Sequence, residues 1–378
     1  MAGAALTAPP ATETSLRAAA DPVERRAAVR ERVSASGLDA LLVMALSNIR
    51  YLSGFSGSAG LLIVRAEPPD VFLTDFRYQS QVAGELDAAI EVRIESESML
   101  KVARELLHGQ GASRVAFERE QLTYRGWSEW SQIEGPALVP VTEWVEEARA
   151  VKSSAEIDAI RGACRVADEA FESILAEVRP GITERELAAR LDLSLVERGA
   201  ERASFETIVA FGEHSALPHA RPGSRQLRRG DMVLFDFGAV VDGYVSDMTR
   251  TVSCGDPPAK MRDVYAIVLE AQRTALGGIQ AGMSGPEADG LARQVIDAAG
   301  YGPRFGHSLG HGIGLEVHEA PRLSKKSEDR LAPGMTITIE PGIYLEGIAG
   351  VRIEDDALIT DAGLEALTAS PKDDLIIL

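Results

Sequence analysis

The sequence predicts an α/β domain followed by a second domain that consists of two similar halves, each made of a helix and a β-hairpin. Over about the first 145 residues, apolar strand-like runs alternate with helical runs, which is typical of an α/β domain. In the second half of the chain, two patterns recur at offsets of 101 and 104 residues, which indicates an internal duplication. The predicted fold class is therefore α/β joined to α+β, with an internal pseudo-two-fold repeat in the second domain.

The composition is that of a soluble globular protein. The chain has 378 residues, of which 45% are hydrophobic and 25% charged, enough for two or three domains. Its formal charge of −18 repels phosphate backbones and anionic lipid surfaces, so we expect neither nucleic acid nor a membrane as a partner. No apolar stretch approaches the roughly 20 residues that span a bilayer. A small molecule or a peptide is the favoured partner.

The cysteines and the N-terminal stretch bear on location. Cys164 and Cys254 are too few for a disulfide framework and lack the paired spacing of a zinc site, so we expect a cytoplasmic protein. Residues 1–20 are rich in Ala, Thr and Pro and lack the basic and apolar regions of a secretory signal. We predict a disordered tail over these residues.

The first domain is predicted at residues 21–147, from hydrophobic periodicity and the positions of glycines. Its expected elements are helices at 21–36, 78–86 and 97–111, strands at 38–45 and 71–76, and two strand-like runs separated by glycines within 48–64. The character of the sequence changes near residues 145–150, which places the second domain at 148–378. Ser153 and Glu156 form a predicted capping box that begins a long helix there.

The duplicated pattern begins with a capped helix. Residues 180–199 and 281–300 each contain a Thr or Ser, a glutamate three residues later, an amphipathic run and a closing glycine. Residues 230–236 and 334–340 each run from a glycine through a strand to a carboxylate. The second domain is therefore expected to contain two helix-plus-hairpin halves.

Each strand of this pattern ends in an acid, and a second acid follows it. Asp236 precedes Asp247 in the first half, and Glu340 precedes Glu354 in the second half. Taken alone, each pair could lie on a solvated hairpin face. If symmetry relates the two halves, however, four carboxylates meet at one centre.

The first pair of acids lies on a predicted hairpin. Asp242 and Gly243, between alternating apolar residues, are typical of a two-residue turn. Counting outward from this turn gives three cross-strand pairs: Val241 with Tyr244, Asp236 with Thr249, and Asp247 with Gly238. Asp236 and Asp247 are then diagonal neighbours on one face, with about 7 Å between their Cβ atoms. We expect Thr249 to hydrogen-bond one of these two carboxylates.

Four carboxylates at a half-dry centre would raise one another's pKa values unless cations lay between them. Two divalent ions would neutralise the four charges and suit metal-assisted hydrolysis. A histidine ligand is available, because His307, His311 and His318 fall among glycines that permit close backbone approach. One imidazole with four carboxylates is an oxygen-rich donor set, which favours manganese over a structural zinc.

These residues resemble the pita-bread metallopeptidases, the family of methionine aminopeptidase, prolidase and X-prolyl aminopeptidase. The resemblance covers residues 150–365 and implies an α+β pita-bread catalytic domain; "GHGIGLEVHE" and "IEPGIY" are similar to the proline-specific branch. The N-terminal half resembles the creatinase-like domain of prolidases and X-prolyl aminopeptidases. Within it, "YLSGFSGSAG" and "FLTDFRYQSQ" resemble the aminopeptidase group especially. The same resemblance implies a homodimer.

The resemblance also implies a metal centre. It would hold two divalent ions, with manganese favoured and cobalt or zinc as alternatives. Asp247 and Glu354 would bridge the ions, and Glu340 would in addition carry a proton. The implied ligands are Asp236, Asp247, His311, Glu340 and Glu354.

Further residues are implied to bind the peptide. His219 and His318 would contact it around the scissile bond and take part in catalysis. The residues that would wall a proline pocket, orient ligands or bind the substrate are His307, Tyr344, Arg352 and Arg322. Arg352 in particular would hold a metal-binding carboxylate in place. His214 is expected at the surface.

The predicted function is X-prolyl aminopeptidase, an exopeptidase that releases the residue before proline from short peptides with proline at the second position. X-Pro dipeptidase is the alternative. Arg322 favours the dipeptidase, because prolidases have an arginine there for the dipeptide's carboxylate, whereas "GFSGSAG" favours the aminopeptidase. A metal-free binding module on the same scaffold is the alternative from another class, and the presence of all five ligand types argues against it.

Overall fold

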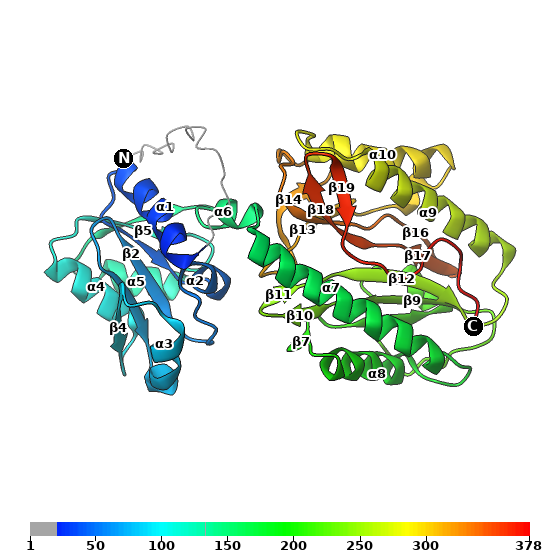
Figure 1. Cartoon of the computed structure of the whole chain (residues 1–378), viewed down its shortest axis with the longest axis horizontal. Coiled ribbons are helices and arrows are strands. Elements are labelled where there is room, and N and C mark those ends of the chain that lie inside the picture. The colour runs from blue at the N-terminus through cyan, green and yellow to red at the C-terminus, as the bar shows by residue number, and fades with distance from the viewer. Residues whose placement is uncertain (1–20, 133) are drawn as a thin grey trace.

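The structure is a computed structural model that describes residues 21–132 and 134–378. The tail predicted at residues 1–20 lies outside the described residues. The described chain forms two lobes joined through a short helix, α6 (Glu146–Ala150) (Figure 1). We call residues 21–145 the N-terminal lobe and residues 154–378 the C-terminal lobe. The domain boundary predicted between residues 147 and 148 falls within α6 and stays a prediction.

A mixed sheet of six strands, in the order β4-β3-β2-β1-β5-β6, forms the centre of the N-terminal lobe. Successive residues of each strand alternate between its two faces. Leu41 and Val43 pack in one apolar cluster with helices α1 and α2, whereas Ala40 and Leu42 pack in another with α4 and α5. The elements are α1 (Pro22–Ala35), β1 (Ala40–Val43), α2 (Leu46–Ser53), β2 (Leu61–Arg65), β3 (Asp70–Thr74), α3 (Gln79–Glu85), β4 (Ile90–Ile94), α4 (Met99–Gly109), β5 (Arg114–Glu118), α5 (Tyr124–Ser131) and β6 (Ala137–Val141).

One predicted element of this lobe is wrong. The first of the two strand-like runs within 48–64 belongs to helix α2, and only the second forms a strand, β2. The glycine after the first run ends a helix instead of separating strands, because Gly54 adopts a left-handed conformation with φ of 81°. Ile49 and Leu52, three residues apart, are both fully buried against the N-terminal lobe's core.

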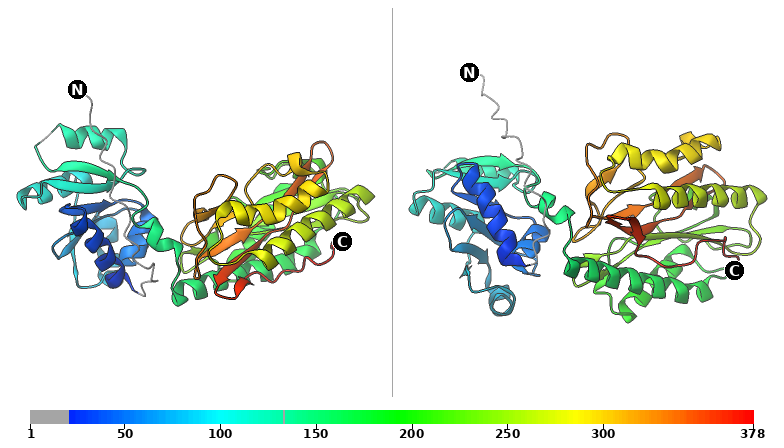
Figure 2. Two further views of the ribbon diagram at one scale, coloured as in Figure 1. Left: turned by 90° about the horizontal axis from the view of Figure 1, so that it is seen from above. Right: turned by 45° about the horizontal axis from the view of Figure 1, so that its top comes forward.

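The C-terminal lobe places two pairs of helices on the outside and curved sheets between them, as two further views show (Figure 2). Its helices are α7 (Ser154–Ile174), α8 (Glu184–Glu197), α9 (Ala259–Gly278) and α10 (Gly285–Ala298). Its strands are β7 (Arg202–Ala203), β8 (Ile208–Phe211), β9 (Met232–Phe237), β10 (Ala239–Val241), β11 (Tyr244–Val245), β12 (Met248–Ser253), β13 (Gly310–Gly312), β14 (Glu319–Leu323), β15 (Thr336–Ile339), β16 (Gly342–Leu345), β17 (Ala349–Arg352), β18 (Asp355–Thr360) and β19 (Gly363–Ala366). No helix in the two described ranges is long and apolar enough to cross a bilayer.

The internal repeat is visible in matching helices. Helices α8 and α10 begin and end at positions 101 residues apart, and both carry a complete capping box. The predicted capping box of Ser153 and Glu156 at the start of α7 is likewise present. Because a capping box satisfies two of the free N–H groups at a helix start, the sequence marks these three starts directly.

The first hairpin has the predicted register. Val241 pairs with Tyr244, and Asp236 pairs with Thr249. Both turn residues have positive φ, 49° for Asp242 and 75° for Gly243, as a tight two-residue turn requires. The ladder is interrupted at Gly238, where a Cβ atom would overlap the carbonyl oxygen of Ser246. The third predicted pair, Asp247 with Gly238, falls in this interruption and is part of neither ladder of the hairpin.

Each half of the C-terminal lobe has its own apolar core. Phe171, Leu191 and Phe235 belong to the first cluster, and Val268 and Ile337 belong to the second. The acids at the strand ends lie between these clusters, where polar side chains from both halves meet.

We predict that Gly238→Ala destabilises the protein, because the added methyl group has no space beside Ser246. Overpacking of this kind costs about 1–3 kcal/mol of unfolding free energy. Gly277→Ala is the matched control, since this helical glycine of α9 has open space around its Cβ position, and there alanine should gain about 0.5–1 kcal/mol. Urea unfolding of both variants measures the two changes, and equal effects would contradict the assignment.

Candidate metal centre and peptide pocket

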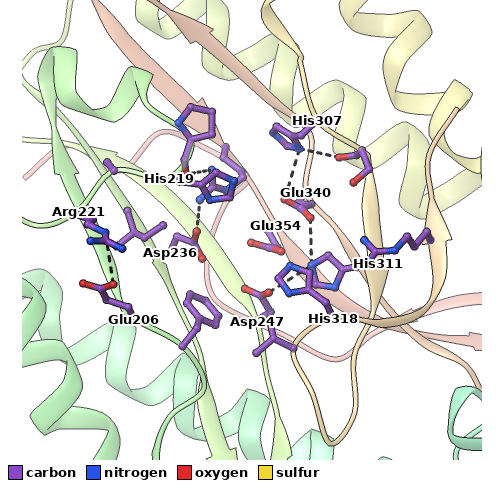
Figure 3. A pocket seen from close by; sticks show the side chains of 18 residues that line it. Glu206, His219, Arg221, Asp236, Asp247, His307, His311, His318, Glu340 and Glu354 are labelled. Carbon is purple, nitrogen blue, oxygen red and sulfur yellow. Dashed lines mark hydrogen bonds and ion pairs between the residues drawn. The ribbon is translucent and has the colours of Figure 1, made fainter. Parts of the chain in front are cut away.

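A cavity of about 570 Å³ opens between the two halves of the C-terminal lobe. Ten of the eleven residues predicted for the site line it (Figure 3): His219, Asp236, Asp247, His307, His311, His318, Arg322, Glu340, Arg352 and Glu354. The eleventh, Tyr344, lies behind the wall and contacts two of the ten. The cavity therefore gathers side chains that are up to 135 positions apart in the sequence.

The strand ends of both halves position the acids. Asp236 lies on β9, and Asp247 directly precedes β12. Glu340 directly follows β15, Glu354 lies between β17 and β18, and His311 lies on β13. Each hairpin thus supplies two carboxylates to one cavity, as the duplication predicts.

The acids and the imidazole are close enough to share ions. One potential ligand atom each from Asp247, His311 and Glu354 lies within 4.8 Å of the other two. The Nε2 atom of His311 is 3.5 Å from Glu340 Oε1 and 3.8 Å from Asp247 Oδ2. Asp236 and Glu340 flank this group and point into the same space (Figure 3).

Charge repulsion marks this cluster as a place for cations. Burial raises the pKa of Asp247 well above its usual range, and the charges of Glu354 and Asp236 raise it further. Burial and the charge of Glu354 likewise raise the pKa of Glu340. Burial, with Asp236, brings the pKa of Glu354 to about 7. Divalent ions among these oxygens would remove the repulsion, so the residues present fit a metal centre.

The surroundings of His311 keep its imidazole neutral, as a metal ligand requires. Burial, together with the charge of His318, lowers its pKa to about 4. Its Nδ1 atom lies 3.1 Å from the carbonyl oxygen of Gly312, which accepts a hydrogen bond when Nδ1 carries the proton. Nε2 is then free of a proton and faces the carboxylates, as a metal-binding imidazole requires.

Comparison with two protein-family models shows which family the chain belongs to. The model of metallopeptidase family M24 matches residues 158–361, and the model of the creatinase/prolidase N-terminal domain matches residues 25–151. The chain belongs to metallopeptidase family M24. Membership implies divalent metal ions, and the predicted fold class, an α/β domain followed by a pita-bread domain, is confirmed.

Three M24 relatives show how far the similarity extends. An Xaa-Pro dipeptidase of Pyrococcus horikoshii is 38% identical, and the match covers 91% of this chain and 96% of that one. The solved structure of an Xaa-Pro dipeptidase from Bacillus anthracis has a TM-score of 0.91 at 40% identity, covering 95% of this chain and all of that one. An X-Pro aminopeptidase from Thermotoga maritima has a TM-score of 0.85 at 37% identity, covering 92% and 99% of the two chains.

Arg352 connects the M24 site to its surroundings. Its guanidinium group donates to the Asp236 carboxylate, to the Tyr344 hydroxyl at 2.8 Å and to Thr249 Oγ1 at 2.8 Å. The Tyr344 hydroxyl also lies 2.9 Å from His307 Nε2. These contacts hold Asp236 and His307 in fixed orientations on the cavity wall.

The predicted partner of Thr249 is wrong. Its hydroxyl donates to Glu354 Oε2 at 2.6 Å, and neither Asp236 nor Asp247 accepts from it among the described residues. The reason is that the second half packs directly over β12: the Glu354 N–H also donates to the Thr249 carbonyl oxygen at 3.1 Å. Pairing within one hairpin could not reveal this contact between the halves.

His214 lies at the surface with its side chain partly exposed, as expected, and it also contacts a buried residue. Its Nδ1 atom is 2.8 Å from Oε1 of Glu184, a fully buried glutamate. The histidine side chain itself is 26% exposed. Glu184 also accepts the backbone N–H groups of Phe211 and Gly223, so this contact closes the loop between β8 and β9.

Of two acids that the sequence analysis did not single out, Asp356 supports the cluster from behind. Asp356 Oδ2 accepts the backbone N–H of Asp247 at 2.9 Å and the thiol of Cys164 at 3.3 Å. Asp355 points the other way, toward Arg250 Nη2 at 2.7 Å and toward Lys372. The sequence did contain a signal for these two residues, the run of three consecutive acids from Glu354 to Asp356. Consecutive acids that are buried each need a different hydrogen-bonding partner.

We predict that manganese stabilises the metal-free protein and that Glu354→Gln removes most of this gain. At a free ion concentration of 100 times the dissociation constant, one site adds about 2.7 kcal/mol to the unfolding free energy. Without metal, the same variant should be at least as stable as the wild type at pH 8, because one repelling charge is gone.

Thermal unfolding with and without manganese measures both the gain from the metal and the difference between variant and wild type without it. Glu184→Gln is the control, a buried glutamate outside this cavity, and it should keep the full manganese gain. An equal gain in Glu354→Gln would exclude Glu354 as a ligand.

We predict that Asp355→Asn destabilises the protein by about 3–5 kcal/mol at pH 7, because it leaves Arg250 buried without its carboxylate. Burial alone would raise the pKa of Asp355, but the charges of Arg250 and Lys372 outweigh it and hold the pKa below the ordinary 3.8. A carboxyl with a lowered pKa stabilises the fold above its unfolded pKa and loses that effect as the pH falls through its folded pKa.

The difference between wild type and Asp355→Asn should therefore be full at pH 7 and shrink below about pH 4. Unfolding in urea over this pH range measures it. Asp256→Asn, at an exposed ion pair with Arg262, is the control and should show no such difference. A difference that grows on acidification would contradict the assignment.

Proposed function

We propose that the protein is a metal-dependent X-Pro dipeptidase, which hydrolyses the bond before proline in a dipeptide. The observation that carries the proposal is Arg322, an exposed cation on the wall of the same cavity. Among the described residues, no carboxylate or other side chain pairs with its guanidinium group, so the group is available to a substrate carboxylate. The dipeptidases of Pyrococcus horikoshii and Bacillus anthracis support the same choice.

Arg322 lies close to the residues proposed to handle the scissile bond. Burial lowers the pKa of His318, and the positive charge of Arg322 adds to the effect. A dipeptide whose C-terminal carboxylate pairs with Arg322 would therefore present its peptide bond between His318 and the acids. A longer peptide has no carboxylate at this point, which limits the substrate to two residues.

His307 lines the cavity with two aromatic rings behind it, and this arrangement suits the proline ring. The ring centroid of His307 lies 5.0 Å from that of Phe305 and 5.6 Å from that of Tyr344. Burial, aided by the charge of Arg352, lowers the pKa of His307 to about 4, so its imidazole is neutral at physiological pH. Proline has no amide hydrogen to offer, and a flat, uncharged surface recognises its ring by shape.

We assign two divalent ions to Asp236, Asp247, His311, Glu340 and Glu354, with manganese favoured by the oxygen-rich donors. When bound, such ions polarise the scissile carbonyl and the attacking water. Glu340 is the proposed proton carrier, because its carboxylate borders both His311 and the open cavity. His219 and His318 also line the cavity and are proposed to donate hydrogen bonds to the peptide carbonyl. The homodimer stays a prediction.

X-Pro aminopeptidase is the second candidate, because the Thermotoga maritima neighbour carries that name at 37% identity. The stretch that favoured it in the sequence, residues 54–60, is not among those that line the cavity. Ser56 of this stretch hydrogen-bonds Glu85, and Ser58 contacts the Tyr78 hydroxyl, both within the N-terminal lobe. This stretch is therefore weaker evidence about the substrate than Arg322 is.

We predict that the manganese-loaded protein cleaves Ala-Pro and that Arg322→Gln reduces its preference for this acid over the amide Ala-Pro-NH2. The wild type should favour the acid by at least tenfold in kcat/KM, which corresponds to about 1.4 kcal/mol of pairing. In the variant, the ratio should fall close to one, because neither substrate then has a cationic partner.

The amide serves as an internal control, since a variant that is merely damaged loses both activities together. Cleavage of Ala-Pro-Ala as fast as Ala-Pro would support the aminopeptidase instead. Absence of any X-Pro hydrolysis with manganese, cobalt or zinc would contradict the proposed function as a whole.

A further inference from the structure

The segment that carries His318 is attached to the rest of the molecule on both sides of the histidine. Residues 313–318 connect β13 to β14, and Glu319 is the first residue of β14. Among the described residues, no hydrogen bond reaches the His318 imidazole; its ring lies against His311, with 4.3 Å between the centroids. The orientation of His318 therefore depends on the backbone that carries it.

Glu319 closes this segment on itself. Its carboxylate accepts the backbone N–H of Glu316 at 3.0 Å, and its side chain is only 6% exposed. A Cβ atom at Gly314 would lie 2.6 Å from Glu319 Oε2, which shows how closely the backbone wraps around the carboxylate. The glutamate next to His318 is thus the centre of the turn.

Two buried cations from the connection between the lobes hold the same carboxylate. Arg149 Nη2 donates to Glu319 Oε1, and Lys152 Nζ lies 3.3 Å from Oε2. The side chains of Arg149 and Lys152 are 3% and 1% exposed. In such a dry environment a charged pair has few alternative partners, so each group is held in one position.

The N-terminal lobe in turn holds Arg149. Its Nη1 atom donates to Asn48 Oδ1 at 2.7 Å and to Ser47 Oγ at 3.0 Å, both on α2. Asn48 Nδ2 donates to Glu118 Oε1 at 2.7 Å, at the end of strand β5. A continuous chain of buried hydrogen bonds therefore runs from the N-terminal sheet to the residue beside His318.

The same lobe also contacts the segment directly. Ser47 Oγ donates to Glu316 Oε1 at 2.6 Å, and Leu315 packs against the apolar cluster of α1, α2 and their strands. On the other side, the Val245 N–H donates to the Gly314 carbonyl oxygen at 2.9 Å. The segment is thus held between the two lobes.

We propose that Glu319, held by Arg149 and Lys152, is a positioning residue that fixes His318 in the cavity and so makes the N-terminal lobe part of the active site. Glu319 does not touch the reacting atoms; it acts through the backbone of His318. The catalytic consequence rests on the proposed peptidase function, whereas the positioning itself is a property of the chain alone.

A double-mutant cycle tests the catalytic consequence. In manganese-loaded protein with Ala-Pro, Glu319→Gln should lower kcat/KM by about 10- to 100-fold, since displacements of about 1 Å at an active site have effects of this size. In a His318→Ala background, the same change should lower kcat/KM less than twofold. Equal losses in both backgrounds, or no loss in the first, would overturn the proposal.

Asp70→Asn is the matched control. Asp70 is a buried carboxylate that pairs with Arg26 and Arg30 inside the N-terminal lobe, away from the cavity. It should lower Tm as Glu319→Gln does but leave kcat/KM unchanged. If Glu319→Gln does not fold, Glu319→Asp keeps the charge and shortens the side chain, and it should show the same non-additivity with His318→Ala.

Hydrogen exchange followed by mass spectrometry tests the positioning without substrate or metal. In Glu319→Gln, amides of residues 314–318 should exchange at least tenfold faster than in the wild type, whereas Asp70→Asn should leave them unchanged. Unchanged exchange in Glu319→Gln would overturn the proposal. Because this measurement needs no peptidase activity, it separates a failure of the positioning proposal from a failure of the proposed function.

Discussion

Repulsion among four buried or partly buried carboxylates is the constraint on which this structure depends. Asp236, Asp247, Glu340 and Glu354 all lie in one cavity, and burial raises the pKa of each of them. A fold gains nothing by collecting such groups unless cations are bound there, because each added negative charge makes the next one more costly. The surrounding contacts can be understood as the means by which the protein holds repelling oxygens at fixed positions.

The contacts that hold these oxygens in place come from residues outside the cluster. Arg352 supplies a positive charge to Asp236, and Thr249 donates to Glu354. Asp356 accepts the N–H of Asp247 from behind, and Arg250 donates to the carbonyl oxygen of Glu354. All four of these contacts join one half of the duplicated lobe to the other. The two halves are thus bound together by the residues that orient the ligands, so the stability of the interface and the geometry of the site have a common origin.

The sequence predicted those features that local rules determine. A two-residue turn at Asp242 and Gly243 dictates the register of its hairpin, and a capping box marks the starts of α7, α8 and α10. The five candidate ligands followed from the duplication and from the family resemblance.

Contacts between segments far apart in the chain could not be predicted, because no local pattern encodes them. Thr249 therefore received the wrong partner, and Glu319 received no role. The helix α2 was misjudged for a related reason, since a segment of eight residues with only four apolar or aromatic side chains can form a strand or a helix, and packing against α1 decides between them.

The N-terminal lobe shows how a second domain can contribute to a site without lining its cavity. None of the residues that line the cavity belongs to residues 21–145, yet α2 reaches the His318 segment through Arg149 and Leu315. An apolar contact alone would hold that segment loosely, because hydrophobic packing is not directional. The Arg149 and Glu319 pair adds direction, since a guanidinium group donates in a fixed planar geometry. Burial of both groups prevents water from replacing either partner. Removing both charges from water is costly, and a hydrophobic pair of similar size could stabilise the same interface equally well. Stability alone therefore does not explain the pair. A need for one defined orientation of the neighbouring histidine does.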